Sequence, residues 1–184
     1  ENLYINCWHI NETDSDAMWK LYSQNDRGVA IQSTLNKLKL SFQDDPQRVD
    51  ITKINYVDYL TDKISNKNII DRFSSKQNSY KHEEELRIFV FNVGMIHDKT
   101  IEVGGQSYSF TAHDENRYQP IRGENGIYVK TKINELIEKV YVSPRAPSWF
   151  VDLVKSVVKT YGIDDNLVEQ SKLYKKPSLN IQTK

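Results

Sequence analysis

Residues 83–91 hold three adjacent carboxylates and an arginine at the start of a run of strand-forming side chains. If this segment is extended, the two-residue period of a strand places Glu83, Glu85 and Arg87 on one face. Such a charged row can present an acid or base to a ligand, and it is also how many ordinary strands end in water. The opposite, core-facing side then consists of Glu84, Leu86, Ile88 and Val90.

Cys7 and His9 are two residues apart on a strand predicted over residues 3–10, so they share a face. A structural zinc site needs four protein ligands and a catalytic one needs three, and the chain has no second cysteine and no closely spaced histidines. We therefore predict no metal site. His9 is then either a half-buried histidine or a catalytic residue that orients a ligand.

Ser33 and Thr34 end a short predicted strand, and their hydroxyls either cap the following helix or orient a ligand. Lys76 precedes Glu83, and together with Asp71 and either Glu83 or Glu85 it imitates the cluster of a metal-dependent nuclease. Such nucleases carry Glu-x-Lys on one strand, whereas this chain has an arginine, Arg87, which is too basic to cycle protons. The other reading places Asp71 and Lys76 on the solvated face of a helix.

The composition excludes several classes of protein. The chain has 184 residues with 25 basic and 25 acidic side chains, so it does not belong to the strongly basic nucleic-acid-binding proteins. A net charge of zero does not exclude a local basic patch. A single cysteine excludes an internal disulfide framework and fits a reducing compartment. No apolar run reaches the length of a membrane span, and the first residues lack the cationic start and apolar stretch of a signal peptide. We therefore expect a cytoplasmic protein without membrane contact.

Short strands alternate with helices along the chain, which predicts an α+β fold with a mixed, mostly antiparallel sheet flanked by helices. We expect one domain over residues 1–174, a flexible tail at 175–184, and a further segment preceding the abrupt first strand. Gly104-Gly105 indicates a hairpin. Strands are predicted over 3–10, 29–34, 50–59, 83–91, 127–129 and 140–142, and helices over 17–22, 35–42, 61–75, 133–138 and 147–161.

Several short motifs follow one another in a fixed order. They are Asn6-Cys7-Trp8-His9, the helix around Met18-Trp19, Gly28-Val29-Ala30-Ile31-x-Ser33-Thr34, Lys76 through Arg87, and Val142-Ser143-Pro144-x-Ala146. In this they resemble an uncharacterised bacterial family, number twenty-nine seventy-one among the domains of unknown function. The resemblance implies a bacterial intracellular protein often encoded near mobile elements or phage-defence genes, and it gives no established reaction.

The order of the polar residues also matches an ADP-ribosyltransferase-like site. Those folds carry His or Arg on a first strand, Ser-Thr or Tyr on a second, and Glu-x-Glu at the opening of a later one. A carboxylate there stabilises the oxocarbenium-like state when NAD loses nicotinamide. Glu85 would be that carboxylate, Glu83 would orient the acceptor, and His9 would complete the catalytic set. Expected ligand contacts are Trp8, Trp19, Tyr22, Ser33, Thr34, Lys76 and Arg87.

Two other functions stay open. The chain is alternatively a non-enzymatic sensor or interaction domain of a defence or toxin system, in which the charged row is structural and Tyr and Trp line a partner surface. The third hypothesis is the metal-dependent nuclease built on Asp71 and Lys76. The expected partners are accordingly a small nucleotide or other defence-system proteins.

Overall fold

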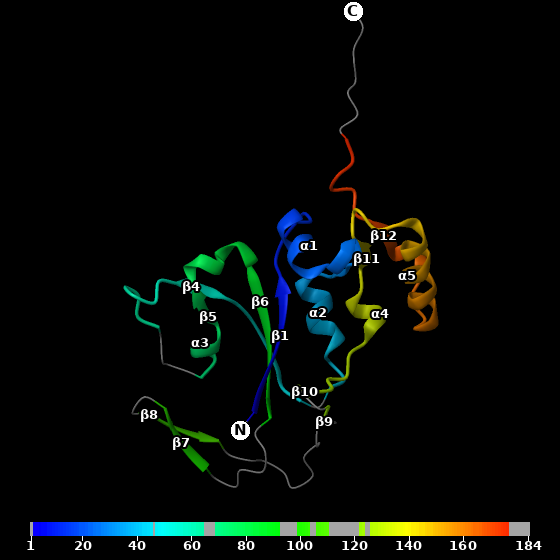
Figure 1. Cartoon of the computed structure of the whole chain (residues 1–184). Coiled ribbons are helices and arrows are strands. Elements are labelled where there is room, and N and C mark those ends of the chain that lie inside the picture. Colours follow the sequence, from blue (N-terminus) through cyan, green and yellow to red (C-terminus); the bar gives the residue numbers. More distant parts are fainter. Residues whose placement is uncertain are drawn as a thin grey trace, which may run out of the picture. The chain divides into compact units, whose positions relative to one another are not determined.

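The computed structural model describes residues 2–45, 47–64, 69–92, 99–103, 106–110, 122–123 and 126–176. The chain divides into two compact units. Unit 1 comprises Glu1–Asn11 and Asp45–Lys130, and unit 2 comprises Glu12–Asp44 and Thr131–Lys184. Helices occur together with sheets that are mostly antiparallel, which confirms the α+β class (Figure 1).

Unit 1 is built on a three-stranded antiparallel sheet in the order β1-β6-β3, with β1 at Asn2–His9, β6 at Glu85–Asn92 and β3 at Val49–Lys53. The central strand β6 is buried on both faces, because Phe89 is buried as fully as its neighbours Ile88 and Val90. The charged row predicted on one face therefore ends at Arg87, and the strand is apolar on both faces beyond it. A central strand covered on both sides reads as a continuous apolar run.

Shorter elements complete unit 1. Strands β4 (Asn55–Val57) and β5 (Ser75–Gln77) pair in parallel, helix α3 spans Ile69–Phe73, and a 3₁₀ helix, η2, spans Asn78–Glu83. Strands β7 (Lys99–Val103) and β8 (Gln106–Phe110) pair antiparallel, which confirms the predicted hairpin, although Gly104 and Gly105 themselves lie outside the described residues. Strands β9 (Arg122–Gly123) and β10 (Gly126–Ile127) form a further short pair.

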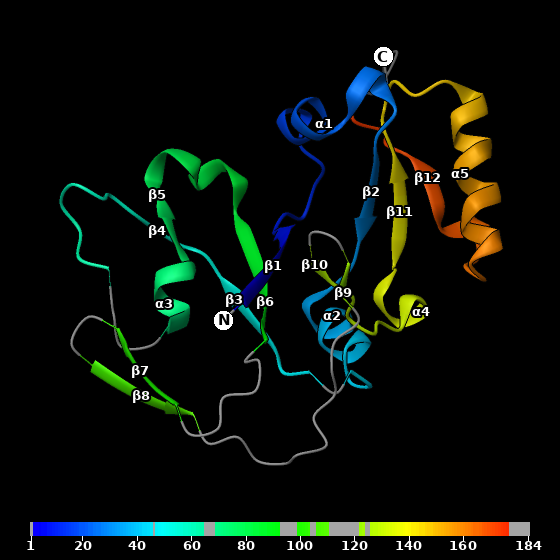
Figure 2. The same ribbon diagram turned by 60° about the horizontal axis from the view of Figure 1, so that its bottom comes forward.

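Unit 2 contains the sheet β12-β11-β2, with β12 at Val168–Gln170, β11 at Lys139–Val142 and β2 at Val29–Gln32 (Figure 2). Strand β11 pairs antiparallel with β2 and parallel with β12. The parallel pair is joined through helix α5 (Ser148–Thr160) and the 3₁₀ helix η3 (Asp165–Leu167). The remaining helices are α1 (Asp16–Tyr22), α2 (Leu35–Ser41) and α4 (Ile133–Leu136), and the 3₁₀ helix η1 spans Gln24–Asp26.

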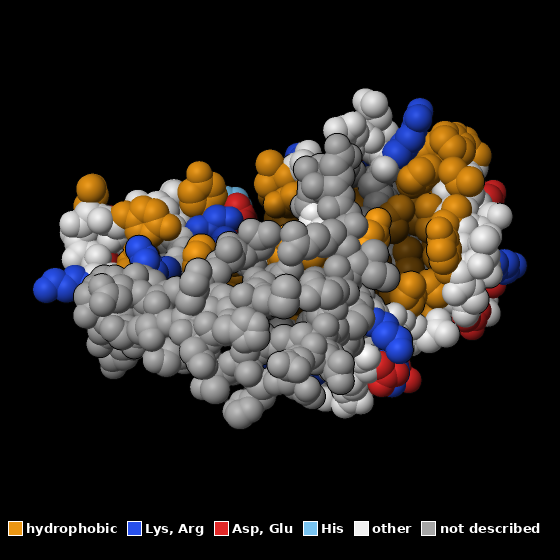
Figure 3. All heavy atoms as spheres, turned by 90° about the horizontal axis from the view of Figure 1, so that it is seen from below, with side chains coloured by type: hydrophobic (Ala, Val, Ile, Leu, Met, Phe, Trp, Pro, Cys, Tyr) orange, Lys and Arg blue, Asp and Glu red, His pale blue; other side chains and the backbone are white. Residues whose placement is uncertain are grey.

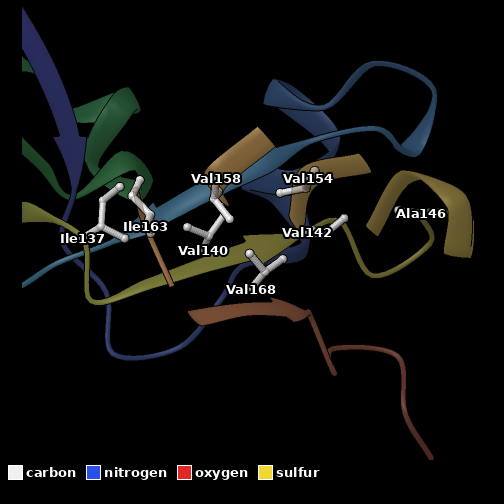
Figure 4. Close-up of a cluster of buried hydrophobic side chains, with 8 residues drawn as sticks. All are labelled: Ile137, Val140, Val142, Ala146, Val154, Val158, Ile163 and Val168. Atoms are coloured by element: carbon white, nitrogen blue, oxygen red, sulfur yellow. The ribbon is translucent and has the colours of Figure 1, made fainter. Parts of the chain in front are cut away.

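The core of unit 2 lies between β11, β12 and α5 (Figure 4). Val140 and Val142 of β11 alternate with polar positions, and Val154 and Val158 of α5 are one helical turn apart, so both pairs present a single buried face. Gly162 follows α5 with a φ of +71°, the left-handed conformation that ends many helices. The helix predicted over 147–161 therefore ends within one residue of its expected end.

Other element predictions need correction. The strand predicted over 50–59 is two strands, β3 and β4, separated at Ile54. Among the described residues of the helix predicted over 61–75, which are 61–64 and 69–75, only α3 is helical, and β10 is shorter than the strand predicted over 127–129. Strands β5 and β12 were not predicted. The predicted domain bounds stay untested, and residues 177–184 of the expected tail lie outside the described part.

Candidate functional site: a buried carboxylate held by two cations

The ladder between β1 and β6 brings the candidate residues of unit 1 together. His9 lies opposite Glu85, and Cys7 lies opposite Arg87. Side chains of directly paired residues in an antiparallel ladder project from the same face. The four side chains therefore share one face at the end of the sheet, as the two-residue spacing predicted for each strand.

Glu85 is the centre of this group and is only 4% exposed. Arg87 donates from Nε to Oε1 at 2.5 Å and from Nη2 to Oε2 at 3.1 Å, and Lys76 Nζ donates to Oε2 at 3.1 Å. Burial alone would raise the pKa of Glu85, but hydrogen bonds from Arg87, Cys7 and Lys76 outweigh it and lower the pKa to about 2. Glu85 is thus ionised throughout the physiological range.

Lys76 links the two candidate carboxylates. Its Nζ donates to Glu83 Oε2 at 2.5 Å as well as to Glu85, and it lies 5.0 Å from the centre of the Tyr80 ring. Partial burial would lower the pKa of Lys76, yet the hydrogen bonds to Glu83 and Glu85 raise it overall. Lys76 is therefore a permanent cation, as is Arg87, so the cluster holds two positive and two negative charges.

The backbone at Glu84 explains how Glu83 and Glu85 converge. Glu84 has a φ of 39°, in the left-handed region that residues other than glycine rarely adopt, and it is the C-cap of η2. Glu83 consequently lies at the end of η2 and not in β6, so the prediction of an extended chain from residue 83 was wrong. The turn nevertheless carries the Glu83 carboxylate to Lys76.

His9 is bound to the same turn. Its Nδ1 donates to the carbonyl oxygen of Glu83, which leaves Nε2 as the acceptor of a 3.4 Å hydrogen bond from the amide of Asn11. A hydrogen bond at Nδ1 fixes which ring nitrogen carries the proton. The imidazole is thus oriented by the turn that also positions Glu83.

Two contributors to this cluster were not predicted from the sequence. The hydroxyl of Tyr56 accepts a hydrogen bond of 2.9 Å from the backbone N–H of Glu85, and Tyr56 pairs with Lys76 in the β4–β5 ladder. Cys7 contacts Glu85 and Arg87, and burial together with a hydrogen bond to Glu85 raises the pKa of its thiol. Cys7 could be related to Glu85 and Arg87 only through the register of β1 against β6. For Tyr56 the sequence indicated a strand and no role in the cluster.

Among the other predicted ligand contacts, only Trp8 belongs to unit 1. It is paired with Leu86, one position from the charged face, and its indole N–H donates to Asn6 at 2.7 Å. The remaining four, which belong to unit 2 and have separate contacts there, are Trp19, Tyr22, Ser33 and Thr34. Thr34 caps α2 by accepting from Lys37 N at 3.2 Å, which confirms the capping interpretation, and Ser33 donates to the carbonyl of Leu136 at 2.6 Å. Tyr22 is exposed.

Trp19 lines a pocket of about 190 Å³ in unit 2. Its indole N–H donates to Asp14 at 3.5 Å. On the pocket wall the guanidinium of Arg145 lies 4.7 Å from the ring centre of Tyr174, whose hydroxyl donates to Asp16. Sequence reasoning did not find this pocket, because Arg145 and Tyr174 lie far from Trp19 in the chain.

Two further properties of the described residues bear on function. Within these residues no group of three or more His, Cys, Asp or Glu side chains has the arrangement of a metal site. A search of the same part of the chain finds no helix with the length and apolar character needed to cross a membrane. Asp71 is the residue of the nuclease hypothesis that lies outside the Glu85 cluster. It is half-buried in α3, and its backbone carbonyl accepts a hydrogen bond of 2.9 Å from the hydroxyl of Ser75.

Comparisons with known proteins identify one family. No curated protein and no solved structure gives a significant match. A family model described as protein of unknown function (DUF2971) matches residues 18–88, which include Lys76, Glu83, Glu85 and the first half of β6. This confirms the resemblance predicted from the ordered motifs, although residues 6–9 and 142–146 lie outside the matched range. From Met18 to Ile88, the chain thus carries the sequence pattern of the DUF2971 family of unknown function.

Proposed function

We propose that the Glu85 cluster is an NAD-dependent site that resembles the active site of ADP-ribosyltransferases. The observation that supports it is the pairing of His9 with Glu85 across β1 and β6, with Glu83 on the adjoining turn. Such sites carry a histidine or arginine on one strand and Glu-x-Glu at the opening of a later one, and the Ser-Thr element expected on a strand between them, Ser33-Thr34, belongs to unit 2. The Glu85 carboxylate projects from the same face of the β1–β6 ladder as His9, and Lys76 joins it to the carboxylate of Glu83.

The loss of nicotinamide from NAD requires a nearby anion that stays charged. When the bond between ribose C1′ and nicotinamide breaks, the bonding electron pair leaves with neutral nicotinamide and positive charge develops on the ribose. Glu85, with a pKa of about 2, supplies a fixed negative charge for that state. The acceptor oxygen then bonds to C1′ and loses its proton to Glu83 or to water.

The ion pairs set a condition on this proposal. Glu85 is almost inaccessible, and both of its oxygens are engaged by Arg87 and Lys76. A nucleotide reaches the carboxylate only if one cation turns from Glu85 toward the substrate. The pyrophosphate of NAD provides the anionic partner for that exchange, since Arg and Lys both bind phosphate oxygens.

Nicotinamide release from NAD tests the proposal. We expect release by the wild type, loss of release in Glu85→Gln, and unchanged release in Glu84→Gln, whose side chain is exposed between the two cluster residues. Because Glu85→Gln also disturbs an ion cluster, circular dichroism should show that the variant is folded, and Glu83→Gln serves as a second, less buried change. Equal release by wild type and Glu85→Gln, or none by the wild type, contradicts the proposal.

A second candidate is a non-enzymatic interaction domain, which a different observation favours. Unit 2 exposes several large apolar side chains on one helix and one neighbouring strand, including Trp149, Leu153 and Ile31. In this function the Glu85 cluster only holds unit 1 together. We further propose that either function serves a bacterial phage-defence or toxin-like system, with other proteins of that system as partners. The nuclease alternative predicts magnesium-dependent cleavage of nucleic acid that depends on Asp71.

A further inference from the structure

Helix α5 is apolar over a wider arc than its own core requires. Val154 and Val158 face the sheet and are buried. Trp149, Leu153 and Val157 follow one another at four-residue intervals, yet each is about half exposed, between 47% and 52%. At about 100° per residue, these two rows together span an arc of about 180°, nearly twice that of an ordinary surface helix. Half of this arc is therefore not covered by the core of unit 2.

The sheet beside α5 has the same property. In the β2–β11 ladder Val29 pairs with Val142 and Ile31 pairs with Val140, so all four side chains lie on one face. The two β11 valines are at most 2% exposed, but Val29 is 48% and Ile31 46% exposed. Strand β2 is an edge strand of its sheet. The core face of the sheet thus continues onto β2, beyond the cover that α5 provides.

A cation–π contact links the two exposed surfaces. The guanidinium of Arg27, two residues before β2, lies 5.3 Å from the ring centre of Trp149 at the start of α5. Hydrophobic side chains gather around a hollow on the α5 side of the molecule (Figure 3). We name this surface the α5–β2 face, and it consists of Val29, Ile31, Trp149, Leu153 and Val157.

The size of the α5–β2 face matches the apolar centre of a dimer interface. Five apolar side chains, each about half exposed, present roughly 400–500 Å², the size of the largest apolar patch on a typical monomer, which is often functional. A standard interface buries about 800 Å² per partner, of which the centre is apolar and the rim polar. Trp and Arg, paired here as Trp149 and Arg27, are the residue types that most often dominate binding energy.

We propose that the α5–β2 face is a homodimer interface and that a second copy of this chain covers it. In a two-fold arrangement the exposed Trp149–Leu153–Val157 row of each helix packs against the same row of the other, as rows at four-residue spacing do in the commonest helix–helix packing. The rim carries both signs of charge, Arg27 and Asp152, so two copies do not repel each other. The proposal develops the interaction-domain candidate and does not depend on NAD chemistry.

Analytical ultracentrifugation over a wide concentration range tests the proposal. We expect the wild type to associate to a dimer and Leu153→Glu to stay monomeric, with the dissociation constant raised at least about 30-fold, as for loss of a central interface residue. Leu60→Glu is the matched control, because Leu60 is a 93% exposed leucine of unit 1 and its change should leave the dimer intact. Trp149→Ala provides a second change within the face that introduces no charge.

The outcomes separate this inference from the NAD proposal. A wild type that remains monomeric at all concentrations overturns the dimer, as does a dimer that persists in both Leu153→Glu and Trp149→Ala. On association the tryptophan emission of the wild type should shift to shorter wavelength, because the Trp149 indole leaves water, and the shift should be absent in Trp149→Ala, which keeps only Trp8 and Trp19. Nicotinamide release by Leu153→Glu is measured in parallel, so either activity can fail without the other.

Discussion

Arg87 holds Glu85 with two hydrogen bonds from its guanidinium although both residues belong to the same strand. Residues two positions apart in a strand share a face, and the long arginine side chain can fold back along it. The remaining Nη1 donates to the carbonyl oxygen of Phe73. Arg87 therefore joins the start of β6 to the end of α3, and Glu85 is the anion that keeps it in place.

We expect Glu85→Gln to destabilise the protein by about 2–3 kcal/mol. Removing one member of a buried ion pair leaves the other charges without compensation, which costs about 3–5 kcal/mol when burial is complete. The lower figure applies because Lys76 retains Glu83 and is itself partly exposed. Urea unfolding measures the change, with the exposed Glu84→Gln as control. An equal free energy of unfolding for wild type and Glu85→Gln would show that the cluster adds no stability.

Acid should weaken the fold through the same residue. The pKa of Glu85 falls from an ordinary 4.5 to about 2 on folding, so its stabilising contribution is complete above pH 4.5 and is lost as the pH falls toward 2. A shift of this size corresponds to about 3 kcal/mol. The free energy of unfolding, measured in urea between pH 6 and pH 2.5, should fall less steeply in Glu85→Gln. Parallel pH profiles for the two proteins would contradict the lowered pKa.

Much of this cluster could be predicted because its members are close in the sequence. Lys76, Glu83, Glu85 and Arg87 lie within twelve positions, and the spacing of the last two fixed their common face. Tyr56 and Cys7 join the cluster only through the pairing of β4 with β5 and of β1 with β6. Such long-range register leaves no pattern within a local window.

The elements that were missed are short or irregular. Strands β5 and β12 have three residues each, too few to show a period of two, and both exist because they pair in parallel with a distant strand. The left-handed Glu84 was invisible because glutamate rarely adopts that conformation. By contrast α5, with thirteen residues and a glycine stop, was predicted almost to its ends.

The hydroxyl of Thr34 should contribute about 1 kcal/mol as the N-cap of α2. We expect Thr34→Ala to lower the free energy of unfolding by that amount, because the N–H of Lys37 loses its acceptor. Thr34→Ser keeps the hydroxyl and should retain most of the stability. Both variants are compared by urea unfolding. If serine and alanine are equally destabilising, the hydroxyl is not the cause.

The contact between Gly28 and Ser23 gives the last prediction. A Cβ atom on Gly28 would lie 2.3 Å from the Cβ of Ser23, and Gly28 cannot retreat because its carbonyl accepts a 2.9 Å hydrogen bond from Ser143 N–H. We expect Gly28→Ala to destabilise the protein by about 2 kcal/mol, as overpacking of a tight contact does.

A double-mutant cycle with Ser23→Gly separates this clash from other effects of the alanine. Ser23→Gly alone removes the hydroxyl that donates to the carbonyl of Trp19, so it should cost about 1 kcal/mol. In the double variant the Cβ of residue 23, which the new Cβ at position 28 would meet, is gone. The total loss in the free energy of unfolding should therefore be at least about 1 kcal/mol smaller than the sum of the two single losses. Strictly additive losses, measured by urea unfolding, would mean that the close approach of the two backbones is not what requires glycine at position 28.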